Sequence, residues 1–280
     1  MVFTPVNRLW YLVNNLGITI YVRGNDIIKM SDRNIDEKVS EVRTEGFCIL
    51  QGCLPVEVID DCNSAFQPVL RDHAKAFAES PNRGPMRHYI PLRFEPPFYD
   101  KRIFENEAIL GIVGKLLGDN TAISEYSTDT PLNGSVLQDI HQDLGILFHE
   151  DSDFVHPPEI IAVNFPYVDV TPDRGPFEIA RGTHHLPYSE ALRGIEEGKF
   201  PLEPLFMNRG DVMIRNPRCL HRGTPNKTDT PRVMAVIGFN RWWLDRSRMA
   251  SPSPMKREVW NGLSDRERNL LRVYAGNIVE

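Results

Sequence analysis

Apolar residues recur at helical spacing in the first part of the chain. The clearest case is residues 55–77, where apolar side chains stand three or four positions apart, which is the period of an amphipathic helix. Pro55 stands where this helix would begin, a position that favours proline, and Gly118 follows a later apolar segment as a stop signal. The pattern predicts helices at residues 7–15, 32–45, 55–77 and 104–117.

From about residue 121 the pattern changes to short β-branched and aromatic runs separated by Gly, Pro, Asn and Asp. Many short strands with frequent turn residues are typical of a sandwich or a jelly-roll barrel. Strands are predicted at residues 18–22, 46–50, 122–126, 138–143, 160–168, 175–179, 211–214, 220–224 and 233–239, and short helices at 186–201 and 265–274. The expected fold class is mainly β (α+β), a barrel supported by N-terminal helices.

Length and composition agree with one folded unit. A chain of 280 residues with 41% hydrophobic and 25% charged residues resembles an ordinary soluble globular protein, and it can bury a sizeable core. We expect a single domain over residues 1–280. Within it, a helix-rich N-terminal support (1–120) precedes a jelly-roll core (121–245) and a C-terminal helical extension (246–280).

Charge and cysteine content narrow the class of partner. A formal net charge of −6 without a dense basic run argues against a nucleic-acid-binding protein. Four scattered cysteines without a C-x-x-C pair fit the reduced thiols of a cytoplasmic protein. The apolar stretch at residues 9–22 is too short and too mixed to span a bilayer. We therefore expect a cytoplasmic protein with a small-molecule substrate and no nucleic-acid or membrane partner; monomer and homodimer both stay open.

The candidate chemistry begins at His141-Gln142-Asp143, at the end of a predicted strand. Residues i and i+2 of a strand point to the same side, so His141 and Asp143 can bind one metal ion together. His221, on a later predicted strand, is the best candidate for a third ligand. Two histidines and one carboxylate leave three metal positions open, which is the pattern of non-haem Fe(II) oxygenases. An isolated H-x-D is weak evidence, since a core histidine beside a turn aspartate gives the same pattern.

Arg232 lies eleven residues after His221 and opens an apolar predicted strand. From a strand start, its guanidinium can point into the barrel beside the metal. There its planar fork can bind the distal carboxylate of a dicarboxylate through two parallel hydrogen bonds. The alternative is a surface arginine that balances Asp229.

Three blocks of sequence surround these residues. They are QDIHQD at 138–143, RGPFEIARGTH at 174–184, and the segment 210–232, which contains GD, HRGTPN and PR. Together they resemble the phytanoyl-CoA dioxygenase family of Fe(II)/2-oxoglutarate-dependent oxygenases. The likeness covers about residues 138–240 in the family's order and spacing, and the blocks are specific as a set.

The resemblance implies a double-stranded β-helix (jelly-roll, cupin-like) fold with a catalytic Fe(II). The implied metal ligands and catalytic residues are His141, Asp143 and His221. The implied co-substrates are 2-oxoglutarate, anchored by Arg232, and O2. Gln138 stands where several relatives have a co-substrate hydrogen-bond donor. Relatives that halogenate lack the carboxylate ligand, so Asp143 favours hydroxylation or another oxidation by oxygen.

Four further polar residues are candidate substrate contacts: Arg87, His88, His149 and His156. The first two precede an apolar segment in the N-terminal half, where they can line an entrance or form surface pairs. The other two lie in an acidic loop after the first ligand strand, which can reach the mouth of the site or remain a solvated loop. His184 is expected to be structural, because neighbouring strand residues face opposite sides and cannot easily share one ion with His185.

These observations predict an Fe(II)/2-oxoglutarate-dependent dioxygenase that releases succinate and CO2. Its substrate is expected to be a small polar metabolite, hydroxylated, desaturated or oxidatively dealkylated in natural-product biosynthesis. The acidic chain shows no basic surface for an acyl-CoA. Two alternatives stay open: a catalytically silent jelly roll that binds a ligand or partner, and a metal-dependent jelly-roll enzyme that uses no 2-oxo acid.

Overall fold

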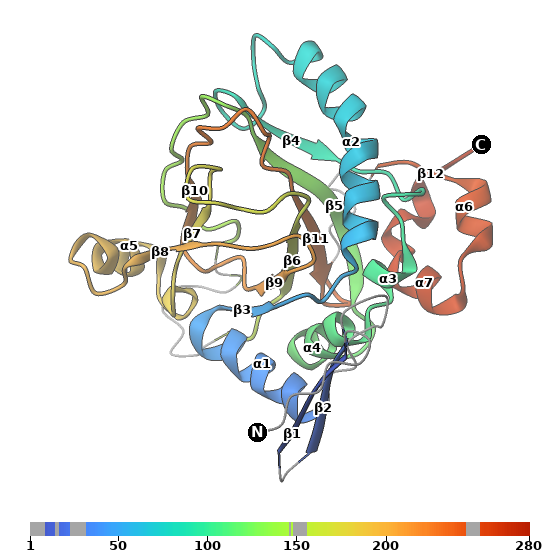
Figure 1. Cartoon of the computed structure of the whole chain (residues 1–280), viewed down its shortest axis with the longest axis horizontal. Coiled ribbons are helices and arrows are strands. Elements are labelled where there is room, and N and C mark those ends of the chain that lie inside the picture. Colours follow the sequence, from blue (N-terminus) through green and yellow to red (C-terminus); the bar gives the residue numbers. More distant parts are fainter. Residues whose placement is uncertain (1–8, 15–16, 23–31, 146, 148–155, 245–252) are drawn as a thin grey trace.

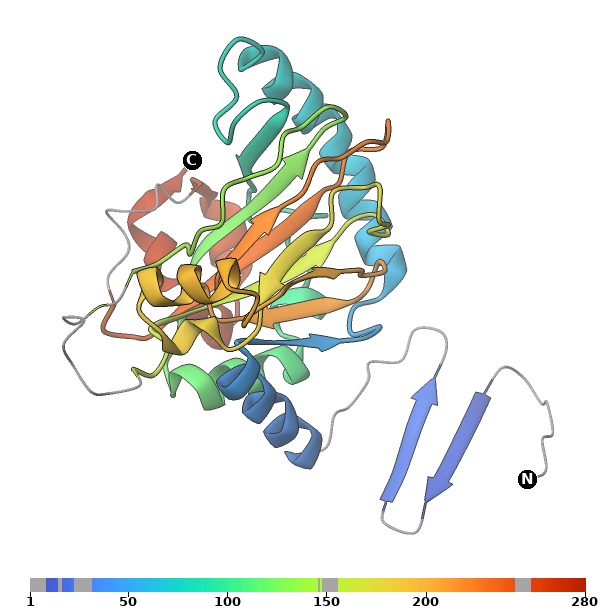
Figure 2. The same cartoon turned by 90° about the vertical axis from the view of Figure 1, so that its left-hand side faces the viewer.

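Two antiparallel sheets face each other at the centre of the molecule (Figures 1 and 2). The computed structural model describes residues 9–14, 17–22, 32–145, 147, 156–244 and 253–280. The larger sheet has the order β3 (Phe47–Leu50), β9 (Val212–Arg215), β6 (Ile160–Pro166), β11 (Met234–Asn240), β5 (Ala122–Pro131) and β4 (Arg87–Pro91). The smaller sheet has the order β10 (His221–Gly223), β7 (Phe177–Ala180) and β8 (Leu202–Leu205). This arrangement is the jelly roll that the sequence predicted.

Two small strand pairs lie outside these sheets. The strands β1 (Leu9–Asn14) and β2 (Gly17–Val22) form an antiparallel hairpin. The strands β12 (Met255–Lys256) and β13 (Ile278–Val279) pair in parallel near the C-terminus.

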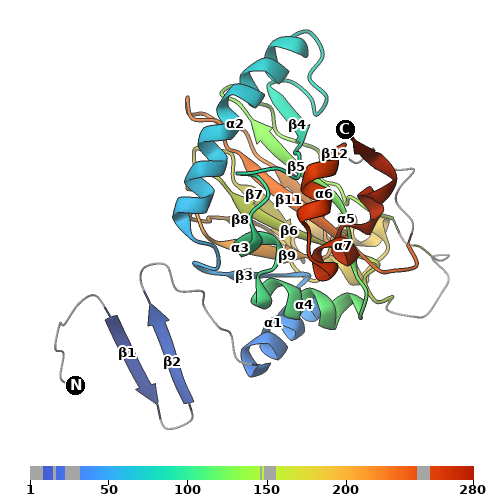
Figure 3. The same ribbon diagram turned by 90° about the vertical axis from the view of Figure 1, so that its right-hand side faces the viewer.

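Helices cover the outer face of the larger sheet (Figures 1 and 3). They are α1 (Asp32–Glu45), α2 (Val56–Ala76), α3 (Lys101–Phe104) and α4 (Glu107–Leu117), with α6 (Arg257–Gly262), α7 (Asp265–Leu270) and the 3-10 helix η2 (Arg272–Asn277) towards the C-terminus. The 3-10 helix η1 (Thr183–His185) and α5 (Tyr188–Glu196) follow β7. None of the helices within the described ranges has the length and apolar character that crossing a lipid bilayer requires.

Strand alternation divides the larger sheet between a core and a cavity. On β6, Ile161, Val163 and Phe165 belong to the hydrophobic core beneath the helices. The intervening residues Ala162 and Asn164 point to the other face and line a cavity. All seven residues of β6 are buried, because both faces of the strand are covered.

A second, smaller core fills one end of the space between the sheets. It joins side chains of both sheets, including Phe47, Met213 and Met234 from the larger and Ile179 from the smaller. The cavity adjoins this core, because Met234 and Phe177 contribute to both.

Most predicted helices are confirmed. The segment 32–45 is α1, and 55–77 corresponds to α2, which Pro55 precedes as its N-cap. In 104–117 the helix α4 begins only at Glu107, because the Asn106 side chain accepts hydrogen bonds from the amides of the first turn and so caps the helix there.

Two local predictions are wrong. Residues 9–14 form the strand β1 instead of part of a helix, and their hydrogen-bonding partner is the adjacent β2. Residues 138–143 contain no regular strand; His141 alone makes an isolated antiparallel bridge to His221. The predicted strand 122–126 is longer than expected and continues as β5 to Pro131.

Candidate active site

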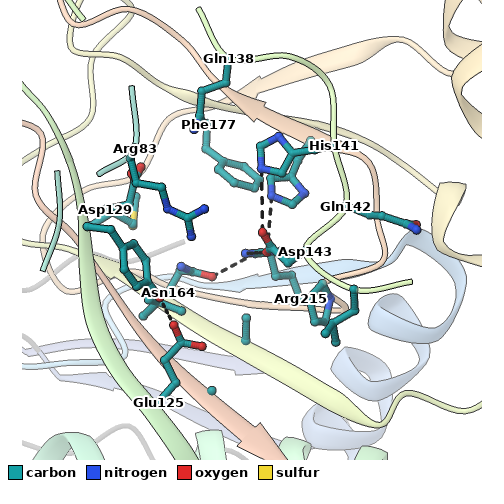
Figure 4. Close-up of a pocket in the computed structure, with 18 of the residues that line it drawn as sticks. Arg83, Glu125, Asp129, Gln138, His141, Gln142, Asp143, Asn164, Phe177 and Arg215 are labelled. Atoms are coloured by element: carbon teal, nitrogen blue, oxygen red, sulfur yellow. Dashed lines mark hydrogen bonds and ion pairs between the residues drawn. The ribbon is translucent and has the colours of Figure 1, made fainter. Parts of the chain in front are cut away.

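A cavity of about 330 Å³ lies between the two sheets (Figure 4). The larger sheet supplies side chains from β4, β5, β6, β9 and β11, and the smaller sheet from β7 and β10. Its polar lining includes His141, Asp143, His221, Arg215, Arg232 and Gln138.

The structure brings His141, Asp143 and His221 together on one side of this cavity. One ligand atom from each lies within 4.8 Å of the others, and no other such group of three occurs among the described residues. The Nε2 atom of His141 is 3.8 Å from Oδ1 of Asp143, and Nε2 of His221 is 3.5 Å from Oδ2. Mutual backbone hydrogen bonds of 3.0 and 2.9 Å between His141 and His221 hold the two histidines side by side.

Backbone carbonyl groups orient both imidazole rings. The Nδ1 atom of His141 lies 2.8 Å from the carbonyl oxygen of Asp139, and Nδ1 of His221 lies 2.8 Å from that of Cys219. A carbonyl only accepts, so each Nδ1 carries the proton and each Nε2 keeps a lone pair. This is the arrangement in which histidine binds a metal. Burial and the nearby Arg215 cation also lower the pKa of His221, which favours the neutral, metal-binding ring.

Arg215 fixes the carboxylate of Asp143. Its Nη2 donates to Oδ2 of Asp143 at 2.6 Å, while its Nε donates to the side-chain oxygen of Asn164 at 3.2 Å. Burial alone would raise the pKa of Asp143, but Arg215 and His221 outweigh it and hold the pKa well below its usual range. Asp143 is therefore ionised and oriented, as a candidate oxygen ligand should be.

Arg232 lies in the same cavity and is almost fully buried, with 1% of its surface exposed. Its Nε donates to the carbonyl of Gly175, Nη1 to the carbonyl of Asp129, and Nη2 to the carboxylate of Asp129. These contacts use three of the five N–H donors that a guanidinium offers. Burial lowers the pKa of Arg232 to about 10, against the opposing effect of Asp129, so the side chain is a cation at neutral pH.

Asp129 joins two arginines at this end of the cavity. Besides Arg232, it binds Nη1 of Arg87 at 2.9 Å. Burial would raise the pKa of Asp129, but Arg87 and Arg232 lower it below its usual value. Two cations with one carboxylate leave this end of the cavity with a net positive charge, which favours an anionic group of a ligand.

Gln138 and Gly223 adjoin this positive end. The Gln138 side-chain oxygen accepts a hydrogen bond of 2.9 Å from the amide of Gly223, so its amide nitrogen is directed elsewhere. A Cβ atom at position 223 would lie 2.5 Å from Nη1 of Arg87 and 2.6 Å from the Gln138 oxygen. Glycine is therefore the residue that lets both side chains approach the strand.

Three of the remaining predicted contacts, Arg87, His88 and His156, do not line the cavity. Arg87 is buried behind Asp129, and its other hydrogen bond goes to the carbonyl of Thr224. His88 follows it in β4 and therefore faces the opposite side, where its ring packs edge-on against His73 at 5.3 Å. His156 lies in a separate pocket beside His184 and His185. His149 lies outside the described residues. Arg87 thus orders the site indirectly, and His88 and His156 are poor candidates for substrate contacts.

Several lining residues were not predicted from the sequence. Glu125 lies within the predicted strand 122–126, and Asp129 lies beyond it on β5. Arg215 is the last residue of β9. Phe177 stacks on the His221 ring, with centroids 4.8 Å apart. The sequence offered one signal for these residues, which is a charged residue within an otherwise apolar strand. Such a residue is rarely buried unless it is paired or functional.

Comparisons with known proteins identify the family. The family model described as Phytanoyl-CoA dioxygenase (PhyH) matches residues 42–234, more than half of the chain. A solved structure of SnoK, a non-heme alpha ketoglutarate dependent carbocyclase from nogalamycin biosynthesis, is 15% identical with a TM-score of 0.59, over 80% of this chain and 94% of that chain.

Two further structures share the fold. HygX from Streptomyces hygroscopicus, with nickel, 2-oxoglutarate and hygromycin B bound, is 16% identical with a TM-score of 0.54, over 79% of this chain and 90% of that chain. EctD from S. alaskensis, with bound Fe, is 17% identical with a TM-score of 0.57, over 78% and 79% of the two chains. The chain belongs to the phytanoyl-CoA dioxygenase family and is a non-haem Fe(II)- and 2-oxoglutarate-dependent enzyme, as its motifs indicated.

Proposed function

We propose that this protein is a dioxygenase in which His141, Asp143 and His221 hold Fe(II) and Arg232 binds the distal carboxylate of 2-oxoglutarate. The observation that supports this most directly is the convergence of all four side chains in one cavity. The histidine rings present Nε2 lone pairs, and Asp143 is held ionised by Arg215. Two imidazoles and one carboxylate are the donor set that suits non-haem Fe(II).

The positive end of the cavity fits the co-substrate. Arg232 is anchored by Gly175 and Asp129, so its guanidinium is ordered before any ligand binds. A guanidinium of fixed orientation binds a carboxylate through parallel hydrogen bonds at little further entropic cost. We propose that the Gln138 amide adds a donor on the same side.

The residues that line the cavity orient the substrate and limit the access of water. When bound, Fe(II) with 2-oxoglutarate and O2 supplies the oxidising power, and the co-substrate leaves as succinate and CO2. Phe177, Met234 and Val236 give the cavity apolar surfaces beside the polar groups, which limit the water around the reacting atoms. The remaining lining residues position one C–H bond of the substrate, since orientation governs which bond reacts.

The substrate that we propose is a small polar metabolite of natural-product biosynthesis, which is hydroxylated, desaturated or oxidatively dealkylated. The cavity is at the small end of the range for ligand pockets, and its charged lining suits a polar compound. The structural neighbours include enzymes of nogalamycin biosynthesis and one crystallised with hygromycin B, which supports the same setting.

The two alternatives from the sequence fit the site less well. A silent binding protein has no need for histidines whose proton-bearing nitrogens are fixed by carbonyl groups, or for Arg215 on the ligand carboxylate. A metal enzyme that uses no 2-oxo acid leaves the buried Arg232 without a role in the cavity.

Anaerobic titration with Fe(II) and 2-oxoglutarate tests this function. We expect the weak visible charge-transfer band of the iron–oxo-acid complex in the wild-type protein and its loss in His141→Ala. His185→Ala is the matched control, because that histidine is exposed and lies in the separate pocket. Iron binding without the band would favour the enzyme that uses no oxo acid, and absence of iron binding would favour the silent protein.

A further inference from the structure

The side of the cavity away from the two histidines carries a second group of polar residues (Figure 4). The Tyr89 hydroxyl donates a hydrogen bond to the Glu125 carboxylate. The Arg83 guanidinium lies 4.5 Å from the centroid of the Tyr89 ring. We call Arg83, Tyr89 and Glu125 the polar wall.

Glu125 stands at one end of a row of residues across the larger sheet. In register, Glu125 is opposite Gly238, Gly238 opposite Ala162, and Ala162 opposite Arg215. Adjacent strands are about 4.8 Å apart, so the ends of this row are separated by roughly 14 Å. The row therefore forms a floor of small residues between the polar wall and the arginine that holds the metal carboxylate.

Gly238 keeps space beside the Glu125 side chain. A Cβ atom at this position would lie 3.0 Å from the Glu125 Cβ and 3.4 Å from its Oε2. The strand pairing also shifts between Gly238 and Phe239, where β5 has one extra residue, Ser124, opposite β11. Bulges are frequent next to active sites, where they redirect a side chain. Both features open the cavity at the carboxylate of Glu125.

The iron and co-substrate groups are held by other residues. Asp129, four residues further along β5, neutralises Arg87 and orders Arg232. Asp143 serves the metal and pairs with Arg215. Glu125 is thus a second carboxylate on the cavity face of β5 that the iron and co-substrate site does not use. Glu125 lines the cavity, where its carboxylate can accept hydrogen bonds from a ligand.

Resting on the proposed function, we propose that the polar wall recognises the substrate, and that the substrate carries a protonated amine next to an oxygen acceptor. The Glu125 carboxylate binds the ammonium group, because a carboxylate accepts several hydrogen bonds at once beside the one from Tyr89. Arg83 donates to the neighbouring hydroxyl or carboxylate oxygen. Charge-assisted hydrogen bonds of this kind are the strong ones, and they hold the far end of the substrate while its C–H bond faces the metal ligands.

Two kinds of metabolite offer this chemistry: an amino sugar or aminocyclitol, whose amine adjoins a hydroxyl, and an amino acid, whose amine adjoins a carboxylate. Both are small enough for a cavity of about 330 Å³. The alternative is that the hydrogen bond between Tyr89 and Glu125 has only a structural role and links β4 to β5. This alternative predicts no preference for amines.

The test is a panel of paired compounds added to the anaerobic Fe(II)/2-oxoglutarate protein. One arm holds amino sugars and aminocyclitols, beginning with glucosamine and N-acetylglucosamine; the other holds the protein amino acids and their N-acetyl forms. Binding is measured as a shift of the charge-transfer band and turnover as succinate release. We expect hits among the free amines of one arm, with apparent affinity at least about tenfold weaker for their N-acetyl partners.

Variants connect the preference to the polar wall. Glu125→Gln should weaken binding of the amine hit by about tenfold or more and leave the titration midpoint for 2-oxoglutarate unchanged. Arg83→Gln should weaken it too, and Arg83 is exposed, so this variant should fold even if Glu125→Gln does not. Glu190→Gln, which changes an exposed acid of α5, is the matched control and should bind like the wild type.

The proposal is overturned if neutral or N-acetylated compounds bind as well as the amines, if no amine of either arm binds, or if both wall variants bind the hit normally. A wild-type protein without the charge-transfer band would instead overturn the proposed function, on which this inference rests. The two failures are distinguishable because the band is recorded before any panel compound is added.

Discussion

Two arginines of the cavity are ordered by different kinds of partner. Arg232 is held by two backbone carbonyls and one carboxylate, so the fold itself fixes its direction. Arg215 is held by the side chains of Asp143 and Asn164, and its Nη1 has no hydrogen-bond partner among the described residues. Arg232 is thus suited to receive an anion, whereas Arg215 depends on the Asp143 carboxylate and in turn orients it.

Replacing Arg232 by lysine should weaken 2-oxoglutarate binding and leave iron binding intact. Lysine keeps the positive charge but lacks the planar fork that grips a carboxylate at two points. We expect the apparent dissociation constant for 2-oxoglutarate to rise by about ten- to a hundredfold, measured from the charge-transfer band at saturating Fe(II). An unchanged constant would show that the co-substrate carboxylate binds elsewhere.

Replacing Arg215 by glutamine should weaken the metal site itself. Asp143 would lose its 2.6 Å hydrogen bond, and the loss of such a partner behind a metal ligand typically costs about ten- to a hundredfold in metal affinity or activity. Anaerobic titration with Co(II), followed by its visible absorption, measures the affinity without turnover. Arg181→Gln provides a control, because Arg181 pairs with Glu203 on the exposed side of β7 and β8. Equal Co(II) affinity in both variants would contradict this role.

At the scale of elements, local pattern predicted the boundaries of the long helices better than the pairing of the strands. The boundaries of α1 and α2 follow from spacing, Pro55 and polar faces, which are properties of the segment alone. The strand predicted at 138–143 fails because its backbone has one bridge, at His141, instead of a continuous partner. β4 was not predicted as a strand, since the five residues Arg87–Pro91 acquire their partner only when β5 is present beside them. Strand pairing depends on residues far apart in the sequence, so the pattern of a single segment does not predict it.

The capping box of α7 supplies a prediction at this scale. The buried Glu267 accepts hydrogen bonds from Tyr99, Ser264 and Lys101. Burial would raise its pKa, but these partners outweigh burial and lower the pKa from 4.5 to about 2. A folded-state pKa below the unfolded value stabilises the protein above about pH 4.5, and this stabilisation is lost as the pH falls towards 2.

Glu267→Gln should therefore unfold more easily at pH 7, by roughly 3 kcal/mol, and the difference from the wild type should shrink as the pH is lowered from 4.5 towards 2. Urea unfolding at a series of pH values measures both effects. Glu258→Gln on the neighbouring helix α6 is the control for a general loss of acidic charge. A difference that stays constant with pH would mean that the carboxylate charge of Glu267 does not contribute to stability.

At the scale of the whole molecule, the active site forms where segments that are distant in the sequence come together. The sequence motifs identified His141, Asp143, His221, Arg232 and Gln138 because each stands in a recognisable block. Asp129, Arg215 and Glu125 carry no such local signal, and they reach the cavity only through the pairing of β5, β11, β6 and β9. The side of β4 on which His88 lies is likewise decided by the register with β5, so the sequence alone left open whether His88 lines an entrance or forms surface pairs. Motifs can therefore point to the candidate metal ligands, but the fold decides which residues surround them.

Because the site joins both sheets, occupying it should stabilise the whole fold. A ligand that binds only the native state stabilises it by about 2.7 kcal/mol at a concentration one hundred times its dissociation constant. For a chain of this size that corresponds to a rise in Tm of roughly 5–10 °C. We expect that rise when Mn(II) and 2-oxoglutarate are added to chelator-treated protein in thermal denaturation. His141→Ala should show no rise, and Arg232→Lys only the part due to the metal. If the wild-type Tm did not respond to the metal, then His141 and Asp143, which lie beside His221 of β10, would not be acting with it as a joint metal site.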